Sequence, residues 1–170
     1  MAHTRYYLEL PQGHEVPIVG RFPDGYVLRR EILPAPLLCR QLYEEVGRGY
    51  QWTDRLEWSD EKWTYHFMKP QLQLWVLWAI SDPAGYFELR REDDDESVEI
   101  AYFGLRPEYT GRGLGGRLLA CAVKQAREIG PRVWVHTCSL DGPSALPNYL
   151  ARGLVEFDHW LEYRLVGAAD

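Results

Sequence analysis

Cysteine, long apolar runs and positive charge are all scarce in this chain of 170 residues. The three cysteines, Cys39, Cys121 and Cys138, lie far apart and form no C-x-x-C pair, which excludes a disulfide framework and a cysteine zinc site. We expect reduced thiols. The longest unbroken apolar run, Leu74 to Ile80, is far too short to cross a bilayer. The first ten residues show no secretory signal pattern, so we expect a cytoplasmic protein with no membrane partner.

The formal net charge is -6, from 25 acidic and 19 basic side chains. That balance repels a polyanion over most of the surface, so we expect no nucleic-acid partner. One segment has the opposite charge, because it contains six basic and two acidic side chains between Gly104 and Arg132. This segment favours an anionic ligand.

The length suits one domain, and hydrophobic patterning predicts a mixture of strands and helices. The predicted strands are Tyr6–Leu10, Tyr26–Ile32, Leu72–Ser81, Tyr86–Glu92, Val98–Leu105, Arg132–Ser139 and one or two strands within Leu154–Val166. The predicted helices are Pro36–Val46, Ser59–Met68, Gly113–Ile129 and Pro143–Ala151. Asp82–Gly85 is predicted as a turn. The acidic run Glu92–Glu96 is predicted as a solvated loop, because a calcium loop needs regularly spaced ligands and an internal glycine. No metal site is expected.

Glycines crowd the segment Thr110–Gly116, between a predicted strand and a predicted helix. The unpaired backbone N–H groups and the dipole at the start of a helix favour phosphate there. Glycines let the phosphate approach the backbone, and Arg112 and Arg117 add positive charge. The segment therefore predicts a phosphate-binding turn.

Other phosphate motifs fit this turn less well. Gly111, Gly113 and Gly116 match G-x-G-x-x-G, but a dinucleotide site begins at the end of a strand and belongs to repeated βαβ units. A Walker A loop needs Lys followed by Ser or Thr, and Gly116-Arg117-Leu118 offers neither. The dinucleotide interpretation stays open as an alternative, as does a turn with no ligand.

Two stretches resemble a known family. Val98–Leu119 resembles the acetyl-CoA motif of the GNAT acyltransferases, whose core is [Q/R]-x-x-G-x-[G/A], with Gly113 and Gly115 at the two small positions. Thr110 stands where the family carries Gln or Arg, which weakens a side-chain contact to the pyrophosphate but leaves the backbone cradle intact. Ala145–Leu154 resembles the family's A-x-x-x-Y-x-x-x-G-[F/L] helix and turn. Two motifs in the right order are more specific than either alone.

The resemblance implies an α/β (α+β) GNAT fold, with a central mixed, mostly antiparallel sheet of about seven strands flanked by about four helices. The sheet would splay between the family's fourth and fifth strands, here Val98–Leu105 and Arg132–Ser139, with the acyl-pantetheine arm in the gap. A helix crossing between these strands makes them parallel neighbours on general grounds. We expect one domain over 1–170, with a variable acceptor-side part at 1–70, an acetyl-CoA core at 71–157, and a closing strand and tail at 158–170.

The resemblance also implies the residues of the site. Tyr149 matches the general acid that protonates the thiolate of coenzyme A, and Glu99 stands where some members carry a base that acts directly or through water. Structural pairing of Glu99 with an arginine is the alternative, since a carboxylate on a central strand needs a partner or a function. The predicted cofactor-binding residues are Leu105, Thr110, Gly111, Arg112, Gly113, Leu114, Gly115, Gly116, Arg117, Asn148 and Tyr149.

Strand alternation places Glu99, Ala101 and Phe103 on one face of their strand and Val98, Ile100 and Tyr102 on the other. The oxyanion donor is expected to be a backbone N–H near Leu105, where the strand is expected to bulge.

Aromatic and acidic side chains alternate in the segment 49–65, which in this fold lies on the acceptor side. Trp52, Asp54, Glu57 and Trp58 are predicted to bind an ammonium group, the alternative being core tryptophans and solvated acids. The histidines at 66, 136 and 159 lack metal-ligand spacing and are interpreted as structural.

The sequence therefore predicts an N-acetyltransferase. It would move an acetyl group from acetyl-CoA to a primary amine of a small molecule or peptide, by direct attack in a ternary complex. A non-catalytic acyl-CoA-binding module and a dinucleotide-binding oxidoreductase are the alternatives. Monomer and homodimer are both compatible with the sequence.

Overall fold

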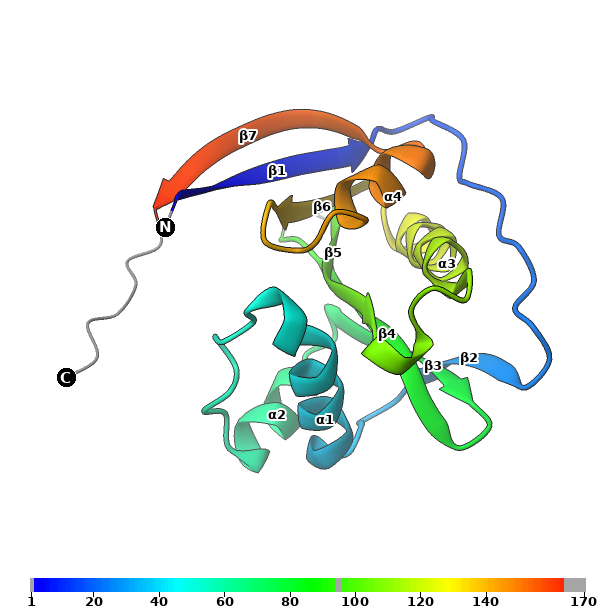
Figure 1. Ribbon diagram of the computed structural model, residues 1–170, viewed down its shortest axis with the longest axis vertical. Helices are drawn as coiled ribbons and strands as arrows, with labels where there is room; N and C mark the ends of the chain where they lie inside the picture. Colours follow the sequence, from blue (N-terminus) through cyan, green and yellow to red (C-terminus); the bar gives the residue numbers. More distant parts are fainter. Residues whose placement is uncertain (1, 94–95, 164–170) are drawn as a thin grey trace.

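The computed structural model describes residues 2–93 and 96–163 (Figure 1). Its strands are β1 (Ala2–Leu10), β2 (Tyr26–Glu31), β3 (Leu72–Ala79), β4 (Asp82–Arg91), β5 (Ser97–Leu105), β6 (Arg132–Cys138) and β7 (Val155–Tyr163). Its helices are α1 (Pro36–Gly47), α2 (Asp60–Phe67), α3 (Leu114–Ile129) and α4 (Ala145–Ala151), with short 3-10 turns η1 (Arg48–Tyr50) and η2 (Pro107–Tyr109). These bounds confirm the predicted α/β class.

The strands form one seven-stranded sheet in the order β2-β3-β4-β5-β6-β1-β7. Every neighbouring pair is antiparallel except β5 and β6, which are joined by the crossing helix α3. The parallel pairing covers only Ser97–Glu99 against Arg132–Trp134, and no pairs follow it toward the carboxyl ends of the described strands. The predicted splay between these two strands is confirmed.

Each face of the sheet carries its own hydrophobic core. On one face, α3 packs Leu118, Leu119 and Val123 against strand residues such as Val98 and Ile100. On the other, α1 and α2 bury Leu42, Tyr43 and Trp63 against Leu74 and Val76. Figure 1 shows α1 and α2 grouped together, apart from α3 and α4. The helices thus leave the gap between β5 and β6 open at its wide end.

Local sequence explains how the helices begin. Pro36 opens α1, where its missing N–H has no intrahelical partner to lose. The side chain of Ser59 accepts a hydrogen bond from the backbone N–H of Lys62 and caps α2. Gly113 precedes α3 with a φ of 73°, a left-handed conformation that glycine adopts without strain.

The turn between β3 and β4 differs from the prediction. Asp82–Gly85 forms the start of β4, and the turn consists of Ile80 and Ser81. A two-residue turn with positive φ at its first position, here 58° at Ile80, matches the twist of a hairpin. Pro83 is tolerated in β4 because it lies at a register shift opposite Trp78.

The first strand has an unexpected place in the sheet. The sequence predicted a strand at Tyr6–Leu10 but did not indicate which strands it pairs with. The structure inserts β1 between β6 and β7, antiparallel to both. Among the described strands, β7 therefore forms an edge of the sheet and pairs only with β1. Of the predicted loop Glu92–Glu96, residues 94–95 lie outside the described residues, as do 164–166 of the last predicted strand. Within the described part of the chain, no helix is long and apolar enough to span a bilayer.

Candidate active site

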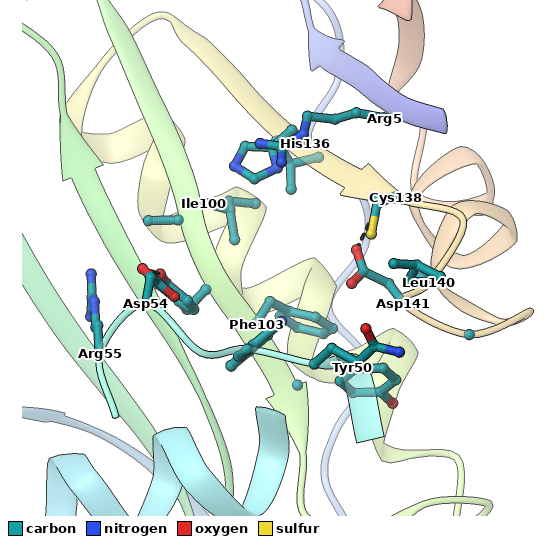
Figure 2. Close-up of a pocket in the computed structure, with 18 of the residues that line it drawn as sticks. Arg5, Tyr50, Asp54, Arg55, Ile100, Phe103, His136, Cys138, Leu140 and Asp141 are labelled. Carbon is teal, nitrogen blue, oxygen red and sulfur yellow. Dashed lines mark hydrogen bonds between the residues drawn. The ribbon is translucent and has the colours of Figure 1, made fainter. Parts of the chain in front are cut away.

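A cleft of about 1240 Å³ opens where β5 and β6 diverge. Its walls come from these two strands, from the chain around residues 50–55, from the glycine-rich turn and from α4. Figure 2 shows side chains from these different parts converging on one hollow, among them Asp54, Phe103 and His136. Residues that are distant in sequence therefore share one solvent-accessible site.

The glycine-rich turn lies at the wide end of the cleft. Gly111 and Gly113 have φ values of 72° and 73°, so a side chain at either position would be strained. The first backbone N–H groups of α3 lack intrahelical partners, and Gly113 supplies no side-chain cap. Thr110 and Gly115 line the cleft beside this helix start. The geometry suits an anion held by backbone amides.

The polar side chains of the turn already have partners. The Thr110 hydroxyl donates to the carbonyl of Pro107 at 2.7 Å, and Arg117 Nη1 donates to the carbonyl of Gly113 at 2.5 Å. Arg112 lies with its guanidinium carbon 5.1 Å from the ring centroid of Tyr109. Arg117 thus binds a carbonyl of the turn and Arg112 packs on Tyr109, and both place positive charge beside the start of α3.

Gly116 lies against Arg152, whose flexible side chain would have to move to admit a Cβ at this position. A Cβ there would lie 1.7 Å from Arg152 Nη2, and Arg152 Nε donates to the Gly116 carbonyl at 2.9 Å. This contact joins the end of α4 to the start of α3. Gly116 and the fully buried Leu114 thus shape the cradle without lining the cleft.

Tyr149 lies on α4 with its ring centroid 6.3 Å from that of Phe103, and only 7% of the residue is exposed. Its hydroxyl makes no hydrogen bond to any residue that the structure describes, and the side chain lines the cleft beside Asn148. Burial, helped by the charge of Asp141, raises the pKa of Tyr149 well above its ordinary value. The phenol therefore keeps its proton at neutral pH.

A β-bulge corrects the predicted faces of β5. The register with β4 shifts so that Glu88 lies opposite Tyr102 and Leu89 opposite Ile100, which leaves Ala101 without a partner. The prediction of a bulge near Leu105 is therefore wrong, because the bulge lies at Ala101. Because one extra residue reverses the alternation, Tyr102 shares the α1–α2 face with the side chain of Glu99.

The same reversal turns Phe103 toward the α3 side, into the core that includes Tyr149. Beyond the bulge the regular ladder resumes, and Arg106 N–H donates to the Ala84 carbonyl at 2.9 Å. Backbone groups alternate direction along an antiparallel strand, so the N–H of Leu105 points away from β4, toward the gap.

Glu99 lies at the narrow end of the gap and is 3% exposed. One carboxylate oxygen accepts a hydrogen bond from Arg90 Nη2, and the other lies 3.5 Å from His136 Nε2. Burial raises the pKa of Glu99, while the charge of Arg90 opposes the rise. The expected arginine partner is present, and so is a histidine that the sequence analysis had interpreted as structural.

The predicted acceptor residues divide into two groups. Trp52, Asp54 and Trp58 line the cleft, whereas Glu57 is exposed outside it. Asp54 accepts hydrogen bonds from the hydroxyls of Tyr43 and Tyr102, each at 2.6 Å. Burial would raise the pKa of Asp54, but the two tyrosine hydrogen bonds outweigh it and hold the pKa below its ordinary value.

A buried ionic network that was not predicted from the sequence lies behind this wall. Both Nη atoms of Arg55 bind the carboxylate of Glu88, at 2.7 and 3.1 Å, and His66 Nε2 lies 2.7 Å from Glu88 Oε1. The guanidinium carbon of Arg55 lies 4.2 Å from the Tyr102 ring centroid and 4.7 Å from that of Trp58. A glutamate within the apolar run of β4 was the available signal, because a carboxylate there requires a partner.

Within residues 2–93 and 96–163, no group of three or more histidine, cysteine or acidic side chains could hold a metal ion. The site is built from backbone amides, a tyrosine, paired carboxylates and aromatic rings. With the splayed sheet and the glycine-rich turn at a helix start, these features define an α/β domain of the acyltransferase class.

The chain belongs to the GNAT acetyltransferase family. The model for the acetyltransferase (GNAT) family matches residues 38–154, which is more than half of the sequence. No curated protein matches the sequence. The match covers α1 through α4, and so includes both the glycine-rich turn and Tyr149.

Solved structures show the same fold at low sequence identity. A GCN5-related N-acetyltransferase from Kribbella flavida is 19% identical with a TM-score of 0.63, covering 90% of this chain and 54% of that one. One from Sphaerobacter thermophilus is 18% identical with a TM-score of 0.65, covering 94% and 50%. This chain thus spans about half the length of both proteins. An aminoglycoside acetyltransferase from an uncultured soil metagenomic sample, in complex with sisomicin, is 11% identical with a TM-score of 0.68, covering 85% and 98%.

The dinucleotide alternative is wrong for this fold. A dinucleotide-binding domain needs a parallel sheet built from repeated βαβ units. Of the strand pairs in the described residues, only β5 with β6 is parallel.

Proposed function

We propose that this protein transfers an acetyl group from acetyl-CoA to a primary amine of a small molecule or peptide, by direct attack in a ternary complex. The chain belongs to the GNAT family, and the arrangement of one cleft is the observation that supports this proposal. A single cleft joins the glycine-rich turn, a buried protonated tyrosine, Tyr149, and a buried carboxylate, Glu99.

Acetyl-CoA would be held mainly by backbone. The Thr110 hydroxyl is engaged with Pro107, so the pyrophosphate would rely on the amides at the start of α3 and on the nearby arginines. The cosubstrate supplies an acetyl group activated as a thioester. The residues proposed to bind it are Leu105, Thr110, Gly111, Arg112, Gly113, Leu114, Gly115, Gly116, Arg117, Asn148 and Tyr149.

Each step of the transfer has a candidate residue. The N–H of Leu105 would donate to the carbonyl oxygen as negative charge develops on it. Tyr149 would give its phenolic proton to the departing thiolate, a role supported by its place in the cleft wall and by a hydroxyl that makes no hydrogen bond to the described residues. Glu99 would serve as the base for the amine, either directly or through water.

The acceptor would enter on the side of α1 and α2. Trp52 and Trp58 offer aromatic faces, and Asp54 stays ionised beside them, which together suit a cationic amine. Glu57 lies outside the cleft and would act at most on approach. A structural neighbour is described as an aminoglycoside acetyltransferase, so sisomicin belongs in a test panel with simpler amines.

Release of free thiol from acetyl-CoA tests the proposal. The panel contains phenethylamine, aniline, sisomicin and a short peptide with a free N-terminus. We expect amine-dependent thiol release by the wild type, and a turnover about 10²-fold lower for Tyr149→Phe, because that variant keeps the ring but removes the proton. Its affinity for acetyl-CoA should hardly change.

Two outcomes would count against this assignment. Acetyl-CoA binding without amine-dependent thiol release would favour a non-catalytic acyl-CoA-binding module. Tyr149→Phe with unchanged turnover across the pH range would leave Tyr149 a packing residue against Phe103.

Asp54 provides a separate test of the acceptor side. Asp54→Asn removes the charge but keeps a side chain of the same shape, so the KM for a cationic amine should rise roughly tenfold while that for acetyl-CoA stays constant. Glu57→Gln is the matched control, since it removes the same charge three residues further along the chain, from an exposed side chain that does not line the cleft. Steady-state kinetics with both substrates measure these KM values. If Asp54→Asn and Glu57→Gln raise the KM for the amine equally, the net charge of the surface attracts the amine and Asp54 has no specific role.

A further inference from the structure

The narrow end of the cleft brings together two residues from different strands. Glu99 pairs with Trp134 in the last parallel pair of β5 and β6, and His136 lies two residues further along β6. Residues two apart in a strand share a face, so His136 projects on the same side as Trp134. Both Glu99 and His136 line the cleft, where the two strands begin to separate.

The distance between the two side chains suits a shared ligand. His136 Nε2 lies 3.5 Å from Glu99 Oε1, while the other oxygen of Glu99 is bound by Arg90. Two lone-pair atoms this far apart can both accept N–H bonds from one ammonium group. Figure 2 shows His136 and Asp54 on opposite sides of the hollow, with Ile100 between them in this view. An ammonium group entering past Asp54 would therefore meet the pair.

The charged groups around His136 leave it available as a base. Arg5 on β1, Arg90 on β4, Asp141 after β6 and Glu162 on β7 face it in addition to Glu99. Asp141 is engaged by Thr137 and the amide of Cys138, and Glu162 by Arg5 and His3. Burial, followed by the charge of Arg5, lowers the pKa of His136, so the imidazole is neutral at neutral pH.

We propose that His136 Nε2 takes the proton from the acceptor's ammonium group and that Glu99 positions and stabilises the resulting imidazolium. The inference deepens the proposed acetyl transfer and rests on it. It makes His136 the catalytic base and Glu99 a positioning residue, a division of roles that neither the motifs nor the family match assigns.

The proton balance of the transfer is complete with these groups. The ammonium loses one proton to His136 Nε2, and the neutral amine forms the C–N bond as the thioester carbonyl becomes an oxyanion. The C–S bond then breaks, and the thiolate takes the proton of Tyr149. The attacking nitrogen then passes its second proton through water to the Tyr149 oxygen, which restores the phenol. His136 releases the proton that it took from the ammonium to solvent. One proton is released per acetyl group transferred to an ammonium.

Kinetics of His136→Gln test the role against the basicity of the acceptor. For phenethylamine, which is protonated at neutral pH, kcat should fall about 10²-fold, and the acidic limb of the pH profile should disappear. For aniline, which is already neutral, the loss should be much smaller. His159→Gln is the matched control, because His159 is also paired with a glutamate, at 2.9 Å from Glu156, but lies on β7 outside the cleft.

Ring-nitrogen NMR of the histidines gives a test that does not depend on turnover. Glu99→Gln removes a negative charge beside His136, so the pKa of His136 should fall further while the His159 signals stay in place. Phenethylamine should shift the His136 signals in the wild type. If Glu99→Gln leaves the His136 titration unchanged, the pairing is absent and the proposal is overturned.

The outcomes distinguish a failure of the role proposed for His136 from a failure of the proposed acetyl transfer. A wild type that releases no thiol with any amine of the panel contradicts acetyl transfer, and the role of His136 with it. A wild type that turns over while His136→Gln keeps its kcat across the pH range contradicts the role of His136 alone.

Discussion

We expect acetyl-CoA to raise the Tm of the wild type and Gly113→Glu to abolish that rise. The residue has a φ of 73° directly before α3, and the substitution adds both strain and a negative charge where the pyrophosphate would meet the backbone amides. Ligand at 100 times its Kd stabilises a native protein by about 2.7 kcal/mol, all of which would be lost. Thermal unfolding with acetyl-CoA, CoA, NAD and ATP measures the effect.

The control for this variant is Gly13→Glu. Gly13 also has a positive φ, 83°, and no atom within 4 Å of an added Cβ, but it lies in a loop outside the cleft. It should suffer comparable backbone strain and keep the full response to acetyl-CoA. Equal stabilisation of the wild type by NAD, or a response retained by Gly113→Glu, would contradict the proposed cofactor site.

We expect Glu88→Ala to lower the free energy of unfolding by about 3–5 kcal/mol, because it leaves the Arg55 guanidinium buried without its carboxylate. In a domain of this size the Tm should fall on the order of 10 °C. Chemical denaturation and calorimetry measure the change. Asp24→Ala, which breaks a fully exposed ion pair with Arg21, should leave the Tm unchanged.

The same network has a predictable pH dependence. Burial alone would raise the pKa of Glu88, but hydrogen bonding from His66 and the charge of Arg55 outweigh burial and hold it below its ordinary value of 4.5. Because the pKa of Glu88 is lower in the folded than in the unfolded state, the ionised carboxylate stabilises the fold fully at pH values above its unfolded-state pKa. This stabilisation is lost as the pH falls through the folded-state pKa. Glu88→Ala should therefore unfold with a weaker dependence on pH in acid than the wild type.

The parts of the site that were predictable depend on local sequence. The glycine-rich turn and the helix of Tyr149 each lie within about ten residues, so their chemistry can be read from spacing. The parallel pairing of β5 and β6 followed from the crossing helix between them. These features needed no knowledge of contacts between distant segments.

What the sequence did not show depends on tertiary structure. The extra residue at Ala101 reverses the faces of β5, and strand alternation cannot reveal a bulge. The pairing of Arg55 with Glu88 joins a loop to a strand 33 residues away, and no local pattern links them. No local pattern showed that His136 lies beside Glu99, because the two residues belong to different strands.

The place of β1 in the sheet has a consequence for how the chain folds. β1, the first strand of the described residues, lies between the last two, with Leu10 paired to Val133 and Glu9 to Val155. It cannot find either partner until nearly all of the described chain is available, so these contacts have the longest loops to close. Such long-range pairing slows folding, and β1 and β7 would be added last to a sheet nucleated by the local hairpins of β3, β4 and β5. The wall of the cleft that carries Arg5 and Glu162 would accordingly be completed at the end of folding.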